Sequence, residues 1–79
     1  MASLKKLQKY EIKFYDHLIS NDDKEIVCTV LGYYLESDKN YHHFTWWIID
    51  TKDQELFDNN IERFSILKTA IINTKKLTS

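Results

Sequence analysis

The chain has 79 residues, a net charge of -1 and one cysteine, Cys28. A single domain of this length, covering residues 1–79, hides only roughly 60% of the surface that its unfolded form exposes, so its stability must come from packing or from self-association. One cysteine excludes an internal disulfide and fits a reducing compartment. The sequence contains neither a signal-peptide pattern nor an apolar stretch of about 20 residues. We therefore predict a cytoplasmic protein that does not enter membranes.

The charges fall into three blocks along the chain. Four lysines against Glu11 give residues 1–14 a net charge of +3, eleven acids against three lysines give residues 15–62 a net charge of -8, and one arginine with three lysines gives residues 63–79 a net charge of +4. The acidic middle predicts a partner with a basic surface. Two other interpretations stay open: the basic ends meet in the fold and attract an anion, or the charges only solvate the surface.

The N-terminal stretch, residues 3–19, fits either a helix or a strand. Its apolar side chains recur at helical spacing, and its Leu, Lys and Gln content favours a helix. Tyr10, Ile12 and Phe14 also alternate with polar side chains, as they would in a strand. We predict a helix over residues 3–18 and keep the strand as the alternative.

The stretch from Glu25 to Asp50 holds most of the β-favouring and aromatic residues and predicts a β-hairpin. Two apolar runs flank Ser37–Asn40, whose four polar residues suit a hairpin loop. The first run also has helical spacing, which leaves an all-α helical bundle as the alternative fold. With a loop at Ser37–Asn40, Glu36 lies opposite Tyr41 and the register of the hairpin follows.

Both faces of this predicted hairpin are apolar. The expected core face sets Tyr33 opposite Phe44, an aromatic pair that stabilises a sheet. The other face has a hollow at Gly32, beside Trp47. Three interpretations of the Trp47 face stay open: ordinary core, an interface with another protein, or a stacking platform for unpaired nucleic-acid bases.

A second helix is predicted from Asn60 to about Lys76. Asn59 followed three residues later by Glu62 matches a capping box, and apolar residues follow at helical spacing. The predicted fold is therefore α+β: a small single domain with an N-terminal helix, a central antiparallel β-hairpin and a C-terminal helix packed on the sheet.

No pattern in the sequence indicates catalysis or metal binding. His42 and His43 are adjacent on the predicted strand and point to opposite faces, so they cannot bind one metal together. Cys28 shares a predicted face with His43 but lies far from it along the strands. A chain with one glycine has no Gly-rich phosphate loop. We predict that the protein is not an enzyme and binds neither a metal nor a cofactor.

Three functions remain. The first is a non-enzymatic protein-binding module, an inhibitor or regulator from a phage or other mobile element that acts on a basic, nucleic-acid-handling partner through its acidic aromatic hairpin. Its predicted partner-binding residues are Tyr34, Glu36, Asp38, Tyr41, His43 and Trp47. The alternative is a nucleic-acid-binding or transcriptional accessory protein that uses the lysines of the two terminal segments, namely Lys5, Lys6, Lys9, Lys13, Lys68, Lys75 and Lys76. The third is a structural homo-oligomer, with a homodimer as its simplest form.

Overall fold

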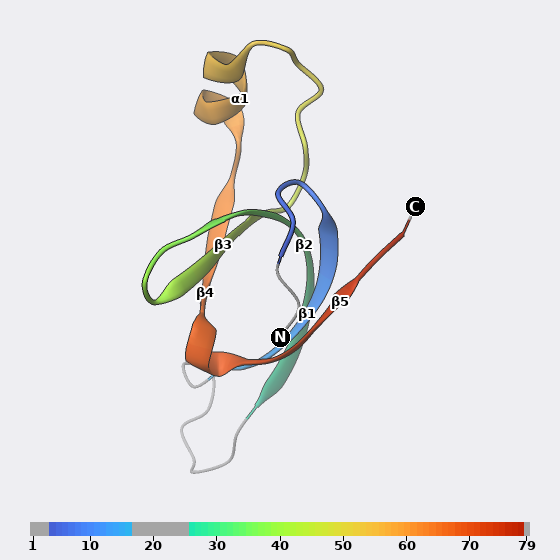
Figure 1. Ribbon diagram of the computed structural model, residues 1–79, viewed down its shortest axis with the longest axis vertical. Helices are drawn as coiled ribbons and strands as arrows, with labels where there is room; N and C mark the ends of the chain where they lie inside the picture. Colours follow the sequence, from blue (N-terminus) through green and yellow to red (C-terminus); the bar gives the residue numbers. More distant parts are fainter. Residues whose placement is uncertain (1–3, 17–25, 79) are drawn as a thin grey trace.

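The computed structural model describes residues 4–16 and 26–78, which form one five-stranded antiparallel sheet with a short helix (Figure 1). The strands are β1 (Lys9–Tyr15), β2 (Val27–Ser37), β3 (Tyr41–Thr45), β4 (Arg63–Leu67) and β5 (Ile71–Lys76). A helix, α1 (Gln54–Asn60), lies between β3 and β4, and a 3-10 turn, η1 (Lys68–Ala70), joins β4 to β5. The strand order is β4-β3-β2-β1-β5, so the first and last strands are neighbours.

The expected terminal helices are both wrong, and so is the all-α alternative. The N-terminal stretch forms β1. The side chains of Tyr10 and Ile12 are buried, and Lys13, which follows Ile12, is exposed. The predicted C-terminal helix is instead β4, η1 and β5. In both stretches the apolar residues suit a period of two as well as 3.6, and pairing with the neighbouring strands decides between the two periods.

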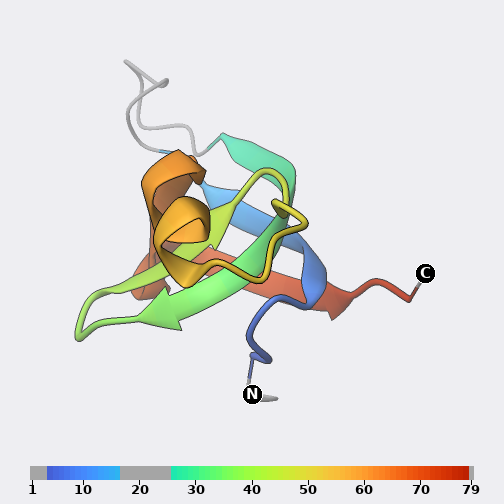
Figure 2. The ribbon, with the colours of Figure 1, turned by 90° about the horizontal axis from the view of Figure 1, so that it is seen from above.

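The core lies on the inner face of this curled sheet, which Figure 2 shows from above. Tyr10, Ile12, Phe44 and Ile66 are buried together, from strands β1, β3 and β4. Half-buried apolar side chains surround them: Leu4, Phe14, Val30, Tyr34, Phe64 and Ile71. Every strand therefore contributes to one core.

The hairpin of β2 and β3 is present, but its predicted register is wrong. Tyr34, rather than Tyr33, pairs with Phe44, and Glu36 pairs with His43 rather than with Tyr41. The pairing shifts between Tyr34 and Glu36, which marks a β-bulge. At this bulge the side chains of β2 no longer alternate simply between the two faces of the sheet. As a result Tyr34 belongs to the core face.

The turn of the hairpin is also tighter than expected, because the Asp38 carboxylate organises it. Asp38 Oδ1 accepts hydrogen bonds from the backbone amides of Asn40 and Tyr41, at 2.9 and 2.8 Å. The Asp38 amide in turn donates to the Tyr41 carbonyl, at 3.0 Å. Aspartate is favoured in turns for this reason: its short side chain satisfies backbone donors two and three residues on.

The hollow predicted at Gly32 is filled from within the chain. The ring of Phe64 covers this glycine, and a Cβ added to Gly32 would lie 2.6 Å from Phe64 Cζ and 3.2 Å from Phe44 Cβ. Gly32 therefore serves the close approach of two core rings and offers no space to a partner.

The segment before β1 folds back over the end of β2. The Leu7 amide donates to the Tyr34 carbonyl at 2.7 Å, and the Tyr34 amide donates to the Gln8 carbonyl at 3.0 Å. Leu7 has a φ of 63°, a left-handed conformation that is strained for a branched side chain. The two backbone bonds to Tyr34 hold the segment in this conformation.

Candidate functional site

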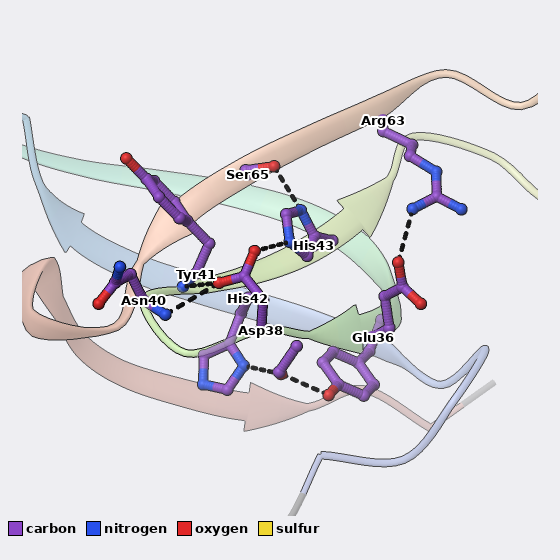
Figure 3. Close-up of polar contacts among 10 residues, drawn as sticks. Glu36, Asp38, Asn40, Tyr41, His42, His43, Arg63 and Ser65 are labelled. Atoms are coloured by element: carbon purple, nitrogen blue, oxygen red, sulfur yellow. Dashed lines mark hydrogen bonds and ion pairs between the residues drawn. The ribbon is translucent and has the colours of Figure 1, made fainter.

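A polar network covers the outer face of the β2–β3 hairpin. His43 of β3 lies between Asp38 in the turn and Ser65 of β4, as Figure 3 shows. His43 Nε2 lies 2.8 Å from Asp38 Oδ2, and His43 Nδ1 lies 2.6 Å from Ser65 Oγ. The strand register explains this arrangement, because His43 pairs directly with Ser65 across β3 and β4.

The same face carries an ion pair between Glu36 and Arg63. Arg63 Nη1 donates to Glu36 Oε1 at 3.0 Å, with both side chains exposed (Figure 3). Exposed pairs of this kind contribute little stability. Glu36 and Asp38 are therefore each engaged within the chain, by Arg63 and by His43.

The pKa of Asp38 is lowered from 3.8 to about 2, first by the hydrogen bond from His43 and then by the backbone donors of Tyr41 and Asn40. Because the folded-state pKa lies below the unfolded one, the stability that this carboxylate contributes is complete above pH 3.8 and is lost as the pH falls toward 2.

We expect His43→Gln to raise the pKa of Asp38, as measured by carboxyl-carbon NMR across an acid titration. Arg63→Gln, on the same face, should leave that pKa low. Equal values in the wild type and His43→Gln would contradict this assignment.

The second histidine belongs to the inner side of the sheet. The Ser37 hydroxyl hydrogen-bonds His42 Nδ1 and lies 2.5 Å from the Tyr34 hydroxyl. Burial lowers the pKa of His42, and the positive charges of Lys68 and His43 lower it further. Because the pKa of His42 is lower in the folded state than in the unfolded state, protonation of His42 opposes folding. The stability that His42 contributes therefore increases as the pH rises toward 6.5.

The Asp38, His43 and Ser65 side chains are of the types that form hydrolytic triads, and the sequence prediction missed them as a group. Ser65 is 22 residues from His43, so only the pairing of β3 with β4 brings them together. A nucleophilic serine also needs oxyanion donors and a cleft to hold a substrate. Neither of the two clefts described below is lined by these residues. We interpret the network as the hydrogen bonding that ties the turn to β3 and β4.

The six predicted partner-binding residues do not form one surface. Tyr34 packs in the core, edge-on to Phe44 with ring centroids 5.8 Å apart. Tyr41 and His43 lie on the outer face, where their rings are 6.3 Å apart. Trp47 lies beyond the end of β3. Of the six, Trp47 is 44% exposed and belongs to the segment between β3 and β4.

Residues 46–62, which we call the projection, extend away from the sheet between β3 and β4. Figure 1 shows α1 at one end of the long axis of the molecule, joined to the sheet by extended chain on both sides. The helix buries none of its side chains, and Leu56 is 53% exposed. Its first turn is capped by Asp53, whose carboxylate accepts from the amides of Glu55 and Leu56 at 3.0 and 3.2 Å.

Apolar side chains are exposed along the projection. Trp46 is 47% exposed and Trp47 44% exposed, and Ile48 is exposed beside them. Trp46 is held in place because its ring stacks on Phe64, with centroids 4.1 Å apart. Both tryptophans follow Thr45, the last residue of β3.

A cleft of about 360 Å³ separates the projection from the segment before β1. Ile48, Ile49 and Phe57 form its apolar side, and Leu7 closes it from the N-terminal segment. Lys6, Asp50, Thr51 and Gln54 complete the lining. The cleft is therefore of mixed polarity, and it begins at Ile48, the residue that follows Trp47.

The projection is acidic as well as apolar. It carries one lysine, Lys52, against five carboxylates: Asp50, Asp53, Glu55, Asp58 and Glu62. The described residues form two ion pairs, and neither includes a carboxylate of the projection. No ion pair within the described ranges therefore neutralises the negative charge of the projection.

The predicted nucleic-acid-binding lysines are brought together only in part. Because β1 and β5 are neighbours, Lys9 and Lys13 lie close to Lys75 and Lys76. Lys5 and Lys6 precede β1 in the same region. Lys68 lies elsewhere, in η1, where its amide donates to the Asn40 carbonyl and its charge affects His42.

Searches of family models, characterised proteins and solved structures found no match to this chain. Within residues 4–16 and 26–78, no group of three or more His, Cys, Asp and Glu side chains is placed to hold a metal. Cys28 pairs with Phe14, on the face opposite to His43, so the expected shared face of Cys28 and His43 is not found. In the same described ranges, no helix has the length and apolar character needed to cross a bilayer.

Proposed function

We propose that this protein is a binding module that captures another protein through the projection. The observation that carries the proposal is the exposure of Trp46, Trp47, Ile48 and Leu56 on a segment with five carboxylates and one lysine. Contiguous exposed apolar side chains on a small domain mark interaction surfaces. This surface replaces the hairpin face as the proposed partner-binding site.

The tryptophans are suited to anchor a partner. Tryptophan is enriched among the residues that dominate binding energy, because one side chain buries a large apolar area at a small entropic cost. Trp46 already has one ring face fixed against Phe64, so less freedom is lost when a partner covers the other. Trp47, next to it, has no aromatic partner among the described residues and is the stronger candidate for insertion into a pocket.

The acidic rim specifies the kind of partner. Unpaired carboxylates around an apolar centre attract a complementary basic surface and exclude acidic ones. Proteins that handle nucleic acid present basic surfaces of this kind. We propose a regulator or inhibitor that occupies such a surface, with the carboxylates of the projection facing lysines and arginines of the partner.

The experiment begins with co-purification of the tagged protein from its native host, followed by purification of the partner and titration calorimetry. We expect Trp47→Ala to weaken the purified complex about 30-fold or more, the loss typical of a buried anchor. Ile72→Ala on β5 is the matched control, because Ile72 and Trp47 are each 44% exposed. The affinity of the wild type should also fall as salt is raised.

Two results would contradict the proposal. One is equal binding by Trp47→Ala and Ile72→Ala, with circular dichroism spectra like that of the wild type. The other is a wild-type homodimer in light scattering that Trp47→Ala converts to a monomer, because the occupant of the projection would then be a second copy of the chain.

A further inference from the structure

The two basic ends of the chain meet at a cleft on the side of Leu7 away from the projection. The Leu77 amide donates to the Lys9 carbonyl at 3.0 Å, and the Gln8 side chain donates to the Leu77 carbonyl at 2.7 Å. These bonds join segments at opposite ends of the sequence. The cleft between them has a volume of about 680 Å³ and is lined by Leu7, Gln8, Lys9, Tyr33, Lys76, Leu77 and Thr78.

The charge of this cleft is entirely positive. Lys9 and Lys76 are its charged lining residues, and no carboxylate lines it. Lys5, Lys6 and Lys75 are near it along the chain. The two ion pairs of the described residues involve none of these five lysines. A chain of net charge -1 thus keeps a local site with unneutralised positive charge.

Tyr33 gives the cleft an aromatic wall. The Lys9 ammonium lies over one face of its ring, 5.8 Å from the centroid, in a cation–π contact. Tyr33 is half-buried on the outer face of β2, opposite Lys9 of β1 and Thr45 of β3. No described residue hydrogen-bonds its hydroxyl group, which leaves this group available to a ligand.

We propose that this cleft binds single-stranded nucleic acid, with a base against Tyr33 and phosphates along the lysines. Aromatic rings and positive charges in one groove are the two elements of sequence-independent single-strand binding. Lysine, as a point charge, contacts phosphates without reading bases. A duplex is a poor fit, because its bases are stacked and cannot reach a ring set in a cleft wall.

The path of the strand follows from the charges on either side. The acidic projection lies beyond Leu7 and repels phosphates, so the strand is expected to leave along β1 and β5. Lys13 and Lys75 lie there, with Glu11 as the one carboxylate of these two strands. This site shares only Leu7 with the lining of the cleft beside the projection, and it does not depend on the proposed function of the projection.

The experiment is fluorescence anisotropy of a labelled twelve-nucleotide oligothymidylate with the full chain. If Lys5, Lys9, Lys13, Lys75 and Lys76 each contact a phosphate, affinity should fall about 100-fold between 50 and 200 mM salt. Tyr33→Leu should weaken binding about tenfold, while Tyr33→Phe, which keeps the ring, should bind like the wild type. Lys76→Gln should weaken binding and reduce the salt dependence; Lys52→Gln, in the projection, is the matched control.

Three results would overturn the proposal: no salt-dependent binding by the wild type; equal binding by Lys76→Gln and Lys52→Gln; or equal competition from polyphosphate at the same phosphate concentration, which would leave Tyr33 without a role. Far-UV circular dichroism and thermal melts of each variant confirm that the fold is kept. If Tyr33→Leu loses its fold, its weaker binding does not test the site. Tyr33→Phe and Lys76→Gln, which keep the packing of β2, then decide between the outcomes.

Discussion

Phe44→Ala is expected to lower the free energy of unfolding by about 3–5 kcal/mol, the usual cost of removing a buried phenylalanine. Phe44 is fully buried, stacks on Phe64 with centroids 5.5 Å apart and meets Tyr34 edge-on. Domains of this size have a stability of only about 5–10 kcal/mol, so the variant should be close to unfolding at room temperature. Urea titration followed by tryptophan fluorescence measures the change.

Tyr41→Ala is the matched control for this prediction. Tyr41 belongs to the same strand but lies 38% exposed on the outer side, so its removal should cost less than about 1 kcal/mol. A similar loss of stability in the two variants would contradict the assignment of the inner and outer faces of β3.

Gly32→Ala is expected to destabilise the protein by about 1–3 kcal/mol, although alanine normally suits a strand better than glycine. The added Cβ would lie 2.6 Å from Phe64 Cζ. The ring cannot move away freely, because Trp46 stacks on it at 4.1 Å and Phe44 lies at 5.5 Å. The urea midpoint should fall accordingly.

A double-mutant cycle tests the cause of this destabilisation. In a Phe64→Leu background the smaller side chain leaves room for the Cβ, so Gly32→Ala should cost much less there. An equal cost of Gly32→Ala in both backgrounds, or a gain in stability in the wild type, would show that Phe64 does not constrain residue 32.

Sequence reasoning predicted the local elements best where the chemistry was local. The turn after Ser37 was expected from its polar residues, and Asp38 indeed satisfies the amides there. The alternation of Tyr10, Ile12 and Phe14 was recognised as a strand pattern but ranked below a helix. Propensity supported that ranking, and only the pairing of β1 with both β2 and β5 overrides it.

The non-local features could not be obtained from the sequence. The bulge between Tyr34 and Glu36 reverses which residues face the core, and a shift of one residue exchanges the two faces of a strand. This shift turns Tyr34 toward the core. Separately, β3 ends at Thr45, so Trp46 and Trp47 lie beyond it. The pairs of Glu36 with Arg63 and of His43 with Ser65 span 27 and 22 residues, so they depend on the strand order alone.

The charge blocks were more informative than the residue pattern. The acidic middle was expected to serve the hairpin, but between residues 26 and 78 the hairpin acids Glu36 and Asp38 are in ion pairs, whereas the five carboxylates of residues 46–62 are in none. The meeting of the basic ends was expected as an alternative, and the neighbouring positions of β1 and β5 bring it about. Lys9 and Lys76, one from each basic end, line one cleft there. Lys68 lies elsewhere, in η1.

The central claim, that the projection binds the partner, is tested most directly by amide chemical-shift mapping of the 15N-labelled protein with its purified partner. If the projection is the binding surface, the largest shifts fall on residues 46–60 and on Lys6 and Leu7, which line the adjoining cleft. Amides of Tyr41–His43 and of β5 should change little. The largest shifts on the hairpin or on β5, with residues 46–60 unchanged, would contradict the claim.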